Sequence, residues 1–205
     1  MNEPPDGPSA RIVSLYERHA TTFDRDRGKT LIEQLWLDRF LAELPAGDGV
    51  LDVGCGTGEP IARYLIKSGL HVVGLDSSPS MIEMCRARFP EREWHVGDMR
   101  QLALGRTFAG IIAWDSFFHL AADDQREMFA RFALHAAPGG VLMFTSGSAA
   151  GEAIGEYCGE PLFHESLDPG AYSDRLENNG FTVIAHVTDD AECGHHTIWL
   201  ARKRA

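Results

Sequence analysis

The chain has 205 residues, of which 44% are hydrophobic and 24% charged, which excludes a disordered or fibrous protein and leaves room for one ordinary globular domain. Its 30 Asp and Glu residues exceed its 19 Lys and Arg residues, giving a formal net charge of -11. This balance disfavours nucleic acid as a partner, because phosphate contacts need clustered Lys and Arg, and it favours a cationic ligand.

The cysteines and the beginning of the chain indicate a cytoplasmic protein. Cys55, Cys85, Cys158 and Cys193 are widely spaced and include no CxxC pair, so we expect no disulfide framework. The acidic, Pro-rich beginning has no apolar signal region, and no apolar run approaches the roughly 20 residues that cross a bilayer. We therefore expect no membrane partner.

The first 46 residues predict a disordered tail over 1–9 and N-terminal helices over 10–46. A helical spacing of apolar residues begins near Arg11 and is interrupted over 22–28. Thr30 is suited to cap a second helix that ends at Pro45. The apolar residues of the two helical patterns are Ile12, Leu15, Tyr16, Ala20, Phe23, Leu31, Leu35, Phe40 and Leu44.

From residue 50 onward, short apolar runs alternate with helical patterns, which is typical of an α/β domain with a mainly parallel sheet. Strands are expected at 50–53, 71–76, 93–96, 108–114 and 141–144, with helices over 60–69, 78–90 and 122–136. The segment 147–169 carries no clear strand pattern and is a candidate lid, or alternatively a flexible connection. A helix over 171–179 then precedes strands at 181–187 and 197–201, which a short polar loop should join as an antiparallel hairpin.

A glycine-rich loop follows the first of these strands. Gly54, Gly56 and Gly58 allow a sharp turn and bring backbone N–H groups close to a ligand, although such a loop can also be a structural turn. A dinucleotide-binding fingerprint needs a small residue where this chain has Glu59, whose carboxylate would repel a pyrophosphate. The loop therefore favours a ligand without phosphates over NAD.

An acidic residue ends the second strand, about 20 residues beyond the loop. Asp76 stands where doubly wound folds place an acid that binds ribose hydroxyls. Capping of the next helix is the alternative role, but Ser77 and Ser78 could cap equally well and leave Asp76 for a ligand. The loop and the acid together favour nucleoside binding.

These residues resemble the motifs of class I S-adenosylmethionine-dependent methyltransferases. The run LDVGCGTG at 51–58 resembles the first motif of that family, and Asp76 matches its ribose-binding acid. Further matches are Gly97-Asp98-Met99, Ala113-Trp114-Asp115-Ser116 and Pro138-Gly139-Gly140. The N-terminal Tyr16, Ala20, Phe23, Asp24 and Arg27 resemble the first helix of the small-molecule, quinone-biosynthesis-like branch.

The resemblance implies a Rossmann-like, doubly wound seven-stranded sheet, mostly parallel with a C-terminal antiparallel hairpin, with helices on both faces and a single domain over 10–205. It implies transfer of a methyl group from S-adenosyl-L-methionine to a small-molecule acceptor, with S-adenosyl-L-homocysteine as product, by a monomer or homodimer without a metal. The alternatives are a non-catalytic S-adenosylmethionine-binding protein and an NAD-dependent oxidoreductase. The implied cofactor-binding residues are Tyr16, Arg27, Asp52, Gly54, Cys55, Gly56, Asp76, Ser77, Asp98, Met99 and Asp115.

Within this set, Asp76 would hold the ribose, and the Asp98 side chain and the Met99 backbone would contact the adenine. Asp98 has an alternative role as a turn residue after Gly97. The backbone of Gly54 and Gly56, with Asp52 nearby, would bracket the methionine part of the cofactor.

Two histidines are candidates for a general base, which is needed only if the acceptor carries a proton. His119 follows the fourth strand, near the proposed cofactor site, and could equally pack in the core or cap the next helix. His164, in the candidate lid, is the second candidate. The residues expected to form the acceptor pocket are Trp114, Phe117, Phe118, Tyr157 and Phe163.

Near the C-terminus, Cys193, His195 and His196 raise the possibility of a metal site. Because adjacent strand residues point to opposite faces, His195 and His196 would chelate one ion poorly, and we predict a hairpin turn without metal. The chain also lacks the Asn-Pro-Pro-Tyr-like motif that marks transfer to base amines in the family, which agrees with the acidic balance against nucleic-acid substrates.

Overall fold

The computed structural model describes residues 8–28, 30–45 and 49–205. Most of the predicted tail over 1–9 therefore lies outside the described residues, although Pro8 and Ser9 belong to a short 3-10 helix, Pro8–Arg11. Within the described chain, no helix is both long enough and apolar enough to cross a membrane.

Helix α1 (Ile12–Asp26) continues through most of the predicted interruption over 22–28. It bends instead at His19, whose φ of -108° and ψ of 15° depart from helical values. Helix α2 (Gln34–Glu43) begins later than predicted, and Glu33 rather than Thr30 stands at its N-cap. Its buried face is formed by Trp36, Leu37 and Phe40, whereas Leu35 is exposed.

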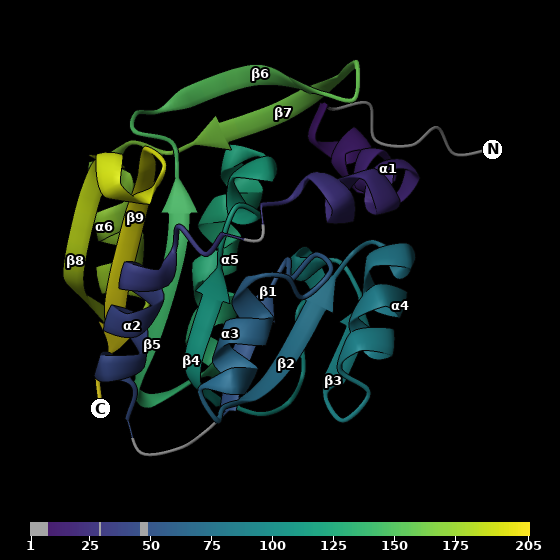
Figure 1. Ribbon diagram of the computed structural model, residues 1–205. Helices are drawn as coiled ribbons and strands as arrows, with labels where there is room; N and C mark the ends of the chain where they lie inside the picture. Colours follow the sequence, from purple (N-terminus) through teal and green to yellow (C-terminus); the bar gives the residue numbers. More distant parts are fainter. Residues whose placement is uncertain (1–7, 29, 46–48) are drawn as a thin grey trace.

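The predicted seven-stranded sheet is confirmed, with the strand order β3-β2-β1-β4-β5-β9-β8. Its last strand along the chain, β9, runs antiparallel to both β5 and β8, and the other pairings are parallel. The chain winds outward from β1 to β3 and then returns to β4 beside β1, so the strand order reverses between β1 and β4 (Figure 1). The strands are β1 (Gly49–Val53), β2 (His71–Asp76), β3 (Glu93–Val96), β4 (Phe108–Ala113), β5 (Ala136–Ser146), β8 (Phe181–Asp190) and β9 (His196–Lys203).

Helices cover both faces of the sheet and bury two apolar clusters. On one face, α2 packs with α3 (Ile61–Lys67) and α4 (Pro79–Arg88), and on the other, α5 (Ala122–His135) packs with α6 (Pro169–Asn178). Strands β1, β4 and β5 contribute buried residues to both clusters, because successive side chains point to opposite faces. These strands are the apolar runs that the sequence predicts, apart from β5, which begins five residues earlier.

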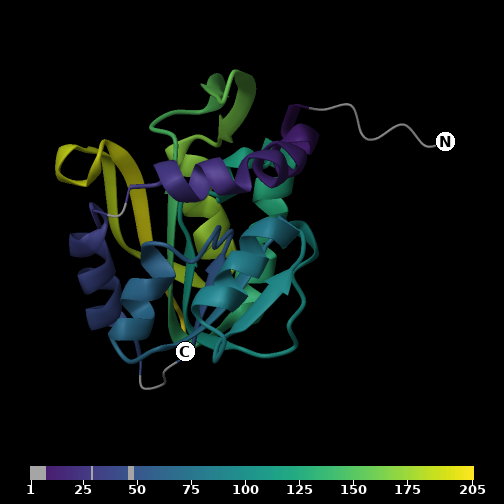
Figure 2. The same ribbon diagram turned by 45° about the vertical axis from the view of Figure 1, so that its right-hand side comes forward.

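The segment 147–169 contains a two-stranded antiparallel sheet, so the expectation of no strand there was wrong. Strand β6 (Gly151–Tyr157) pairs along its whole length with β7 (Glu160–Ser166). Figures 1 and 2 show this hairpin and α1 together above the carboxyl ends of the parallel strands. Glu160 joins the two by ion pairs with Arg18 and His19 of α1.

Gly110 of β4 tests how closely α2 packs on the central strands. A Cβ at this position would lie 2.4 Å from the Phe40 ring and 2.7 Å from Leu44. Since Phe40 is fully buried, we expect Gly110→Ala to lower the free energy of unfolding by about 1–3 kcal/mol in urea denaturation. Gly28→Ala is the control, because its Cβ would meet only Thr30, at 3.6 Å. Equal stability of the two variants would contradict this packing.

Candidate active site

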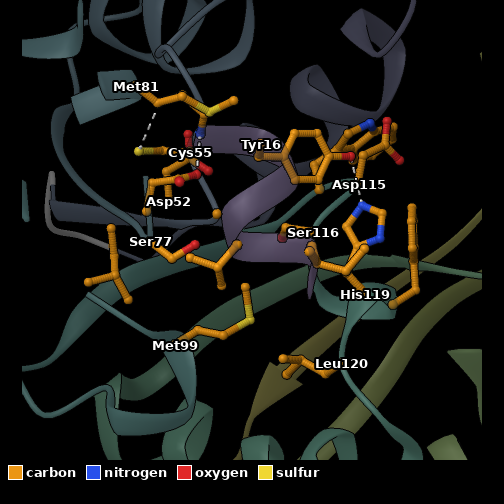
Figure 3. Close-up of a pocket in the computed structure, with 18 of the residues that line it drawn as sticks. Tyr16, Asp52, Cys55, Ser77, Met81, Met99, Asp115, Ser116, His119 and Leu120 are labelled. Carbon is orange, nitrogen blue, oxygen red and sulfur yellow. Dashed lines mark hydrogen bonds between the residues drawn. The ribbon is translucent and has the colours of Figure 1, made fainter. Parts of the chain in front are cut away.

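One cavity of about 410 Å³ lies at the carboxyl ends of β1, β2 and β4, beneath α1 (Figure 3). Every residue predicted to bind the cofactor lines it, as do Trp114, Phe118, His119 and His164. In doubly wound sheets ligands bind at the point where the strand order reverses, which is where this cavity lies.

The glycine loop is shaped by backbone conformations and contacts that exclude side chains. Gly54 and Gly56 have φ values of 76° and 53°, in the left-handed region that favours glycine. A Cβ on Gly54 would lie 2.2 Å from the Cβ of Ser116, and one on Gly56 would lie 3.3 Å from the Phe23 ring of α1. The loop therefore presents bare backbone to the cavity.

Asp76 ties the glycine loop to the start of α4. Its two carboxylate oxygens accept hydrogen bonds from the backbone N–H groups of Gly56 and Ser78, each at 2.9 Å. Burial raises the pKa of Asp76, and these hydrogen bonds offset part of the rise. Ser78 caps α4 through its own hydroxyl, as predicted, so Asp76 is not the side-chain cap of the helix.

Asp52 is a buried carboxyl that faces the cavity without a hydrogen-bond donor among the described residues. The residue as a whole is only 3% exposed to solvent. Burial, followed by repulsion from Asp76, raises the pKa of Asp52 to about 7. A buried acid of this kind is stabilised as the anion by a cationic partner, so the cavity fits a ligand that carries a positive amino group.

Asp98 has the turn role that the sequence left open, and it also lines the cavity. Its carboxylate accepts hydrogen bonds from the backbone N–H of Arg100, at 2.8 Å, and from the Arg100 guanidinium, at 2.6 Å. Burial raises the pKa of Asp98, and the Arg100 contacts outweigh that effect and lower it. The neighbouring Met99 also lines the cavity.

Two polar clusters fasten α1 over the glycine loop. Glu17 accepts hydrogen bonds from the hydroxyls of Ser78 and Ser80 at the start of α4. About two turns further on, Asp24 accepts from the Arg88 guanidinium and from the Thr57 hydroxyl. Since α1 also supplies Tyr16 and Phe23, these contacts fix one wall of the cavity.

Arg27 brings a positive charge to the same wall. It lines the cavity and forms an ion pair with Glu33, which is fully buried. The second carboxylate oxygen of Glu33 has no hydrogen-bond partner among the residues that the structure describes. Arg27 is thus held by one carboxylate, and its guanidinium has further donors for a ligand carboxylate.

His119 is held by hydrogen bonds to both ring nitrogens. Its Nδ1 lies 2.8 Å from the carbonyl oxygen of Phe163, which can only accept, so Nδ1 carries the proton. Its Nε2 therefore accepts from the Tyr16 hydroxyl, at 3.0 Å (Figure 3). Burial lowers the pKa of His119 to about 4 and raises that of Tyr16. His119 orients Tyr16 in this arrangement and is poorly suited to act as a base.

His164 has the freer imidazole of the two candidates. It lines the cavity from β7, and neither ring nitrogen makes a hydrogen bond within the described chain. Its ring centroid lies 4.8 Å from that of His119 and 5.1 Å from that of Phe118. Burial lowers its pKa, so the ring is neutral near pH 7 with a lone pair available.

Three residues expected in the acceptor pocket do not line the cavity. Phe117 is fully buried in the core, with its ring 5.6 Å from that of Phe129 on α5, so its predicted place was wrong. Phe163 is also buried and contributes only its carbonyl, to His119. Tyr157 packs outside the cavity, with its ring 6.0 Å from that of Tyr16.

His196 is a cavity residue that the sequence interpretation missed. Residues 193–195 form the predicted hairpin turn before β9, and His195 points away to Asp189. His196, at the start of β9, instead lies against Asp115, with its Nε2 2.9 Å from Oδ1. No group of three or more potential metal ligands gathers anywhere in the described residues. Nothing in the local sequence indicates this pairing, because the two residues are 81 positions apart.

Comparisons with known proteins agree with this geometry. A family model for a methyltransferase domain matches residues 50–140. A dTDP-3-amino-3,6-dideoxy-alpha-D-glucopyranose N,N-dimethyltransferase from Streptomyces fradiae is 32% identical over 75% of this chain and 55% of its own length. A 2-phytyl-1,4-naphtoquinone methyltransferase from Thermosynechococcus vestitus is 34% identical over 49% of each chain.

Solved structures share the fold. An amino pentose methyltransferase from Micromonospora echinaspora, solved with bound S-adenosylmethionine, superposes with a TM-score of 0.69 and 21% identity, over 91% of this chain and 96% of that chain. By contrast, this chain spans about half the length of the curated relatives it matches.

Asp52 predicts a pH-dependent stability difference. Its folded pKa of about 7 lies above the unfolded value of about 3.9, so its contribution to stability is complete below pH 4 and is lost as the pH rises through 7. Asp52→Asn cannot ionise. Its free energy of unfolding, relative to that of the wild type, should therefore rise by about 2–4 kcal/mol between pH 5 and pH 8.5. Urea denaturation of the ligand-free protein at both values measures this. A difference that does not change with pH would contradict a buried, unpaired carboxyl.

Proposed function

Since the chain belongs to the class I S-adenosylmethionine-dependent methyltransferase family, we propose that it transfers the methyl group of S-adenosylmethionine to a small-molecule acceptor. The observation that carries this proposal is the unpaired Asp52 carboxyl beside Asp76 and a bare glycine loop, in one cavity. When bound, the cofactor supplies a methyl group activated by a positively charged sulfonium. It carries no phosphate, in keeping with Glu59 beside the loop.

The charges around the cavity match the polar groups of this cofactor. Asp76 would accept hydrogen bonds from the ribose hydroxyls, and Asp52 would pair with the amino group of the methionine part. Arg27 would bind its carboxylate, because a guanidinium suits that group. Met99 would offer an apolar contact to the adenine, and the backbone of Gly54 and Gly56 would border the chain between them.

The remaining lining residues would surround the acceptor. Trp114 and Phe118 supply aromatic walls, and Tyr16 and His164 supply polar groups. The β6–β7 hairpin carries His164 and the Phe163 carbonyl, so we assign it the role of a lid that completes the acceptor side. Holding the acceptor nucleophile close to the methyl group is the main contribution that the protein makes to such a displacement.

His164 would receive the proton that the acceptor loses. Its imidazole is neutral and unbonded, whereas both nitrogens of His119 are occupied. The relatives' names do not identify the acceptor, because one acts on an amino sugar and the other on a naphthoquinone.

Calorimetric titration tests the cofactor. We expect S-adenosylmethionine and S-adenosylhomocysteine to bind and NAD not to bind. Asp76→Ala removes both the ribose acceptor and the anchor of the loop, so its affinity should fall by about 1.5–3 kcal/mol, or about 10- to 100-fold. Asp123→Ala, at an exposed carboxylate on α5, is the control and should bind as the wild type does. Binding of NAD, or unchanged affinity in Asp76→Ala, would contradict the proposal.

Substitution of His164 tests the path of the proton. With an acceptor found by screening for S-adenosylhomocysteine release, His164→Ala should lower kcat by about 10²- to 10⁴-fold. Its affinity for S-adenosylmethionine should not change. Because the pKa of His164 is lowered, the acid limb of the wild-type pH profile should lie below pH 6.5. Near-wild-type turnover in His164→Ala would remove His164 from the mechanism.

A further inference from the structure

A histidine–aspartate pair lines the same cavity as the proposed cofactor residues. Asp115 follows β4, and His196 begins β9 on the other side of the neighbouring strand β5. Nε2 of His196 lies 2.9 and 3.0 Å from the two carboxylate oxygens of Asp115. Both residues line the cavity, and their side chains remain 21% and 36% exposed.

The hydrogen bonds of His196 fix its protonation. Its Nδ1 lies 2.6 Å from the carbonyl oxygen of Cys193, which can only accept a proton. Its Nε2 faces a carboxylate, so both nitrogens donate and the ring is an imidazolium. The ring also lies 5.3 Å from the indole of Trp114, a favourable position for a cation. The hydrogen bond to Asp115 raises the pKa of His196, in agreement with these contacts.

Asp115 is held in a conformation that has a cost. Its φ of 47° lies in the left-handed region, which non-glycine residues seldom adopt and which persists where the surroundings impose it. Its backbone N–H donates to the hydroxyl oxygen of Thr145, at 2.9 Å, and Thr145 is fully buried in β5. The side chain is therefore fixed by β5 and β9 rather than by its own loop.

The groups around this pair leave the Asp115 carboxylate as the negatively charged hydrogen-bond acceptor in this part of the cavity. Tyr16, His119 and His164 face the carboxylate and are neutral, and Glu33 faces the imidazolium. The His196 imidazolium is already paired with Asp115, so it is not available to bind an anionic nucleophile such as a carboxylate. A group that carries N–H bonds and develops positive charge would be stabilised.

We infer that Asp115 receives the amino group of an amine acceptor and that His196 is the positioning residue that aims its carboxylate. This inference rests on the proposed methyltransferase function and assigns Asp115 to the acceptor rather than to the cofactor. An amine is favoured over an alcohol because an amine attacks through its own lone pair. An alcohol needs a strong base, and the imidazoles here have lowered pKa values.

An amine that arrives protonated gives one proton to His164, which passes it to solvent. The amine lone pair forms the new N–C bond as the C–S bond breaks, and the sulfur keeps the electron pair. Nitrogen becomes positive during the step, and the Asp115 carboxylate stabilises that charge before the nitrogen loses a proton to His164.

A screen for the acceptor class tests the inference with the full chain. S-adenosylhomocysteine release is measured with a library of small primary and secondary amines and with the alcohols and carboxylic acids of the same skeletons. Methyl transfer confined to amines is the expected result. Transfer to alcohols or acids overturns the inference, and so does an absence of transfer to any amine by protein that binds S-adenosylmethionine. Failure to bind S-adenosylmethionine would instead overturn the proposed function.

Variants of His196 separate positioning from folding. His196→Gln retains a donor close to the place of Nε2, whereas His196→Leu does not. We expect His196→Leu to raise the KM of the amine about tenfold or more and His196→Gln to recover most of the loss, with the Kd of S-adenosylmethionine within about twofold of wild type in both. His195→Gln, in the same turn but directed at Asp189, is the matched control.

Asp115→Asn keeps the size of the side chain but removes its charge, and it should lose amine turnover without losing cofactor affinity. This variant also tests the assignment if His196→Leu does not fold. Wild-type KM in both His196 variants, or a parallel loss of cofactor affinity in all of them, would overturn the assignment.

Discussion

The cavity is organised around a carboxyl that the fold buries and that receives no hydrogen bond from the residues the structure describes. Asp52 is the next-to-last residue of β1, whose other buried residues form the core, so the sheet itself places the acid at this depth. Asp76, on the next strand, raises the cost of ionising it. Because an unpaired buried anion is unfavourable, the Asp52 carboxyl keeps its proton in the ligand-free protein, and a bound cation favours its ionisation.

The other parts of the site serve this arrangement. One carboxylate oxygen of Asp76 holds the glycine loop through Gly56, and the absence of side chains at Gly54 and Gly56 leaves space beside Asp52. Helix α1 closes the space from above through Glu17 and Asp24, and it brings Arg27 to the same wall. The cavity thus divides into an acidic half that suits the cofactor and an aromatic half, under the β6–β7 hairpin, that suits an acceptor.

The sequence predicts what depends on local pattern and leaves out what depends on distant contacts. The apolar runs of β1 and β4 indicate buried strands whatever their neighbours are. The glycine loop can likewise be predicted from its own residues. Strand β6 was missed because its exposed Gly, Ala and Glu residues lack apolar alternation and pair only with β7. The sequence places His196 in a turn and gives no sign of its partner, Asp115, which lies on the far side of β5.

Proton release on cofactor binding tests this account most directly. Calorimetric titration with S-adenosylmethionine in buffers of different ionisation enthalpy counts the protons exchanged. With the pKa of Asp52 at about 7, the account predicts release of about one proton per bound molecule at pH 6 and none at pH 8.5. It also predicts no release at pH 6 by the Asp52→Asn variant. Binding heats at pH 6 that are the same in all buffers would contradict the central role of Asp52.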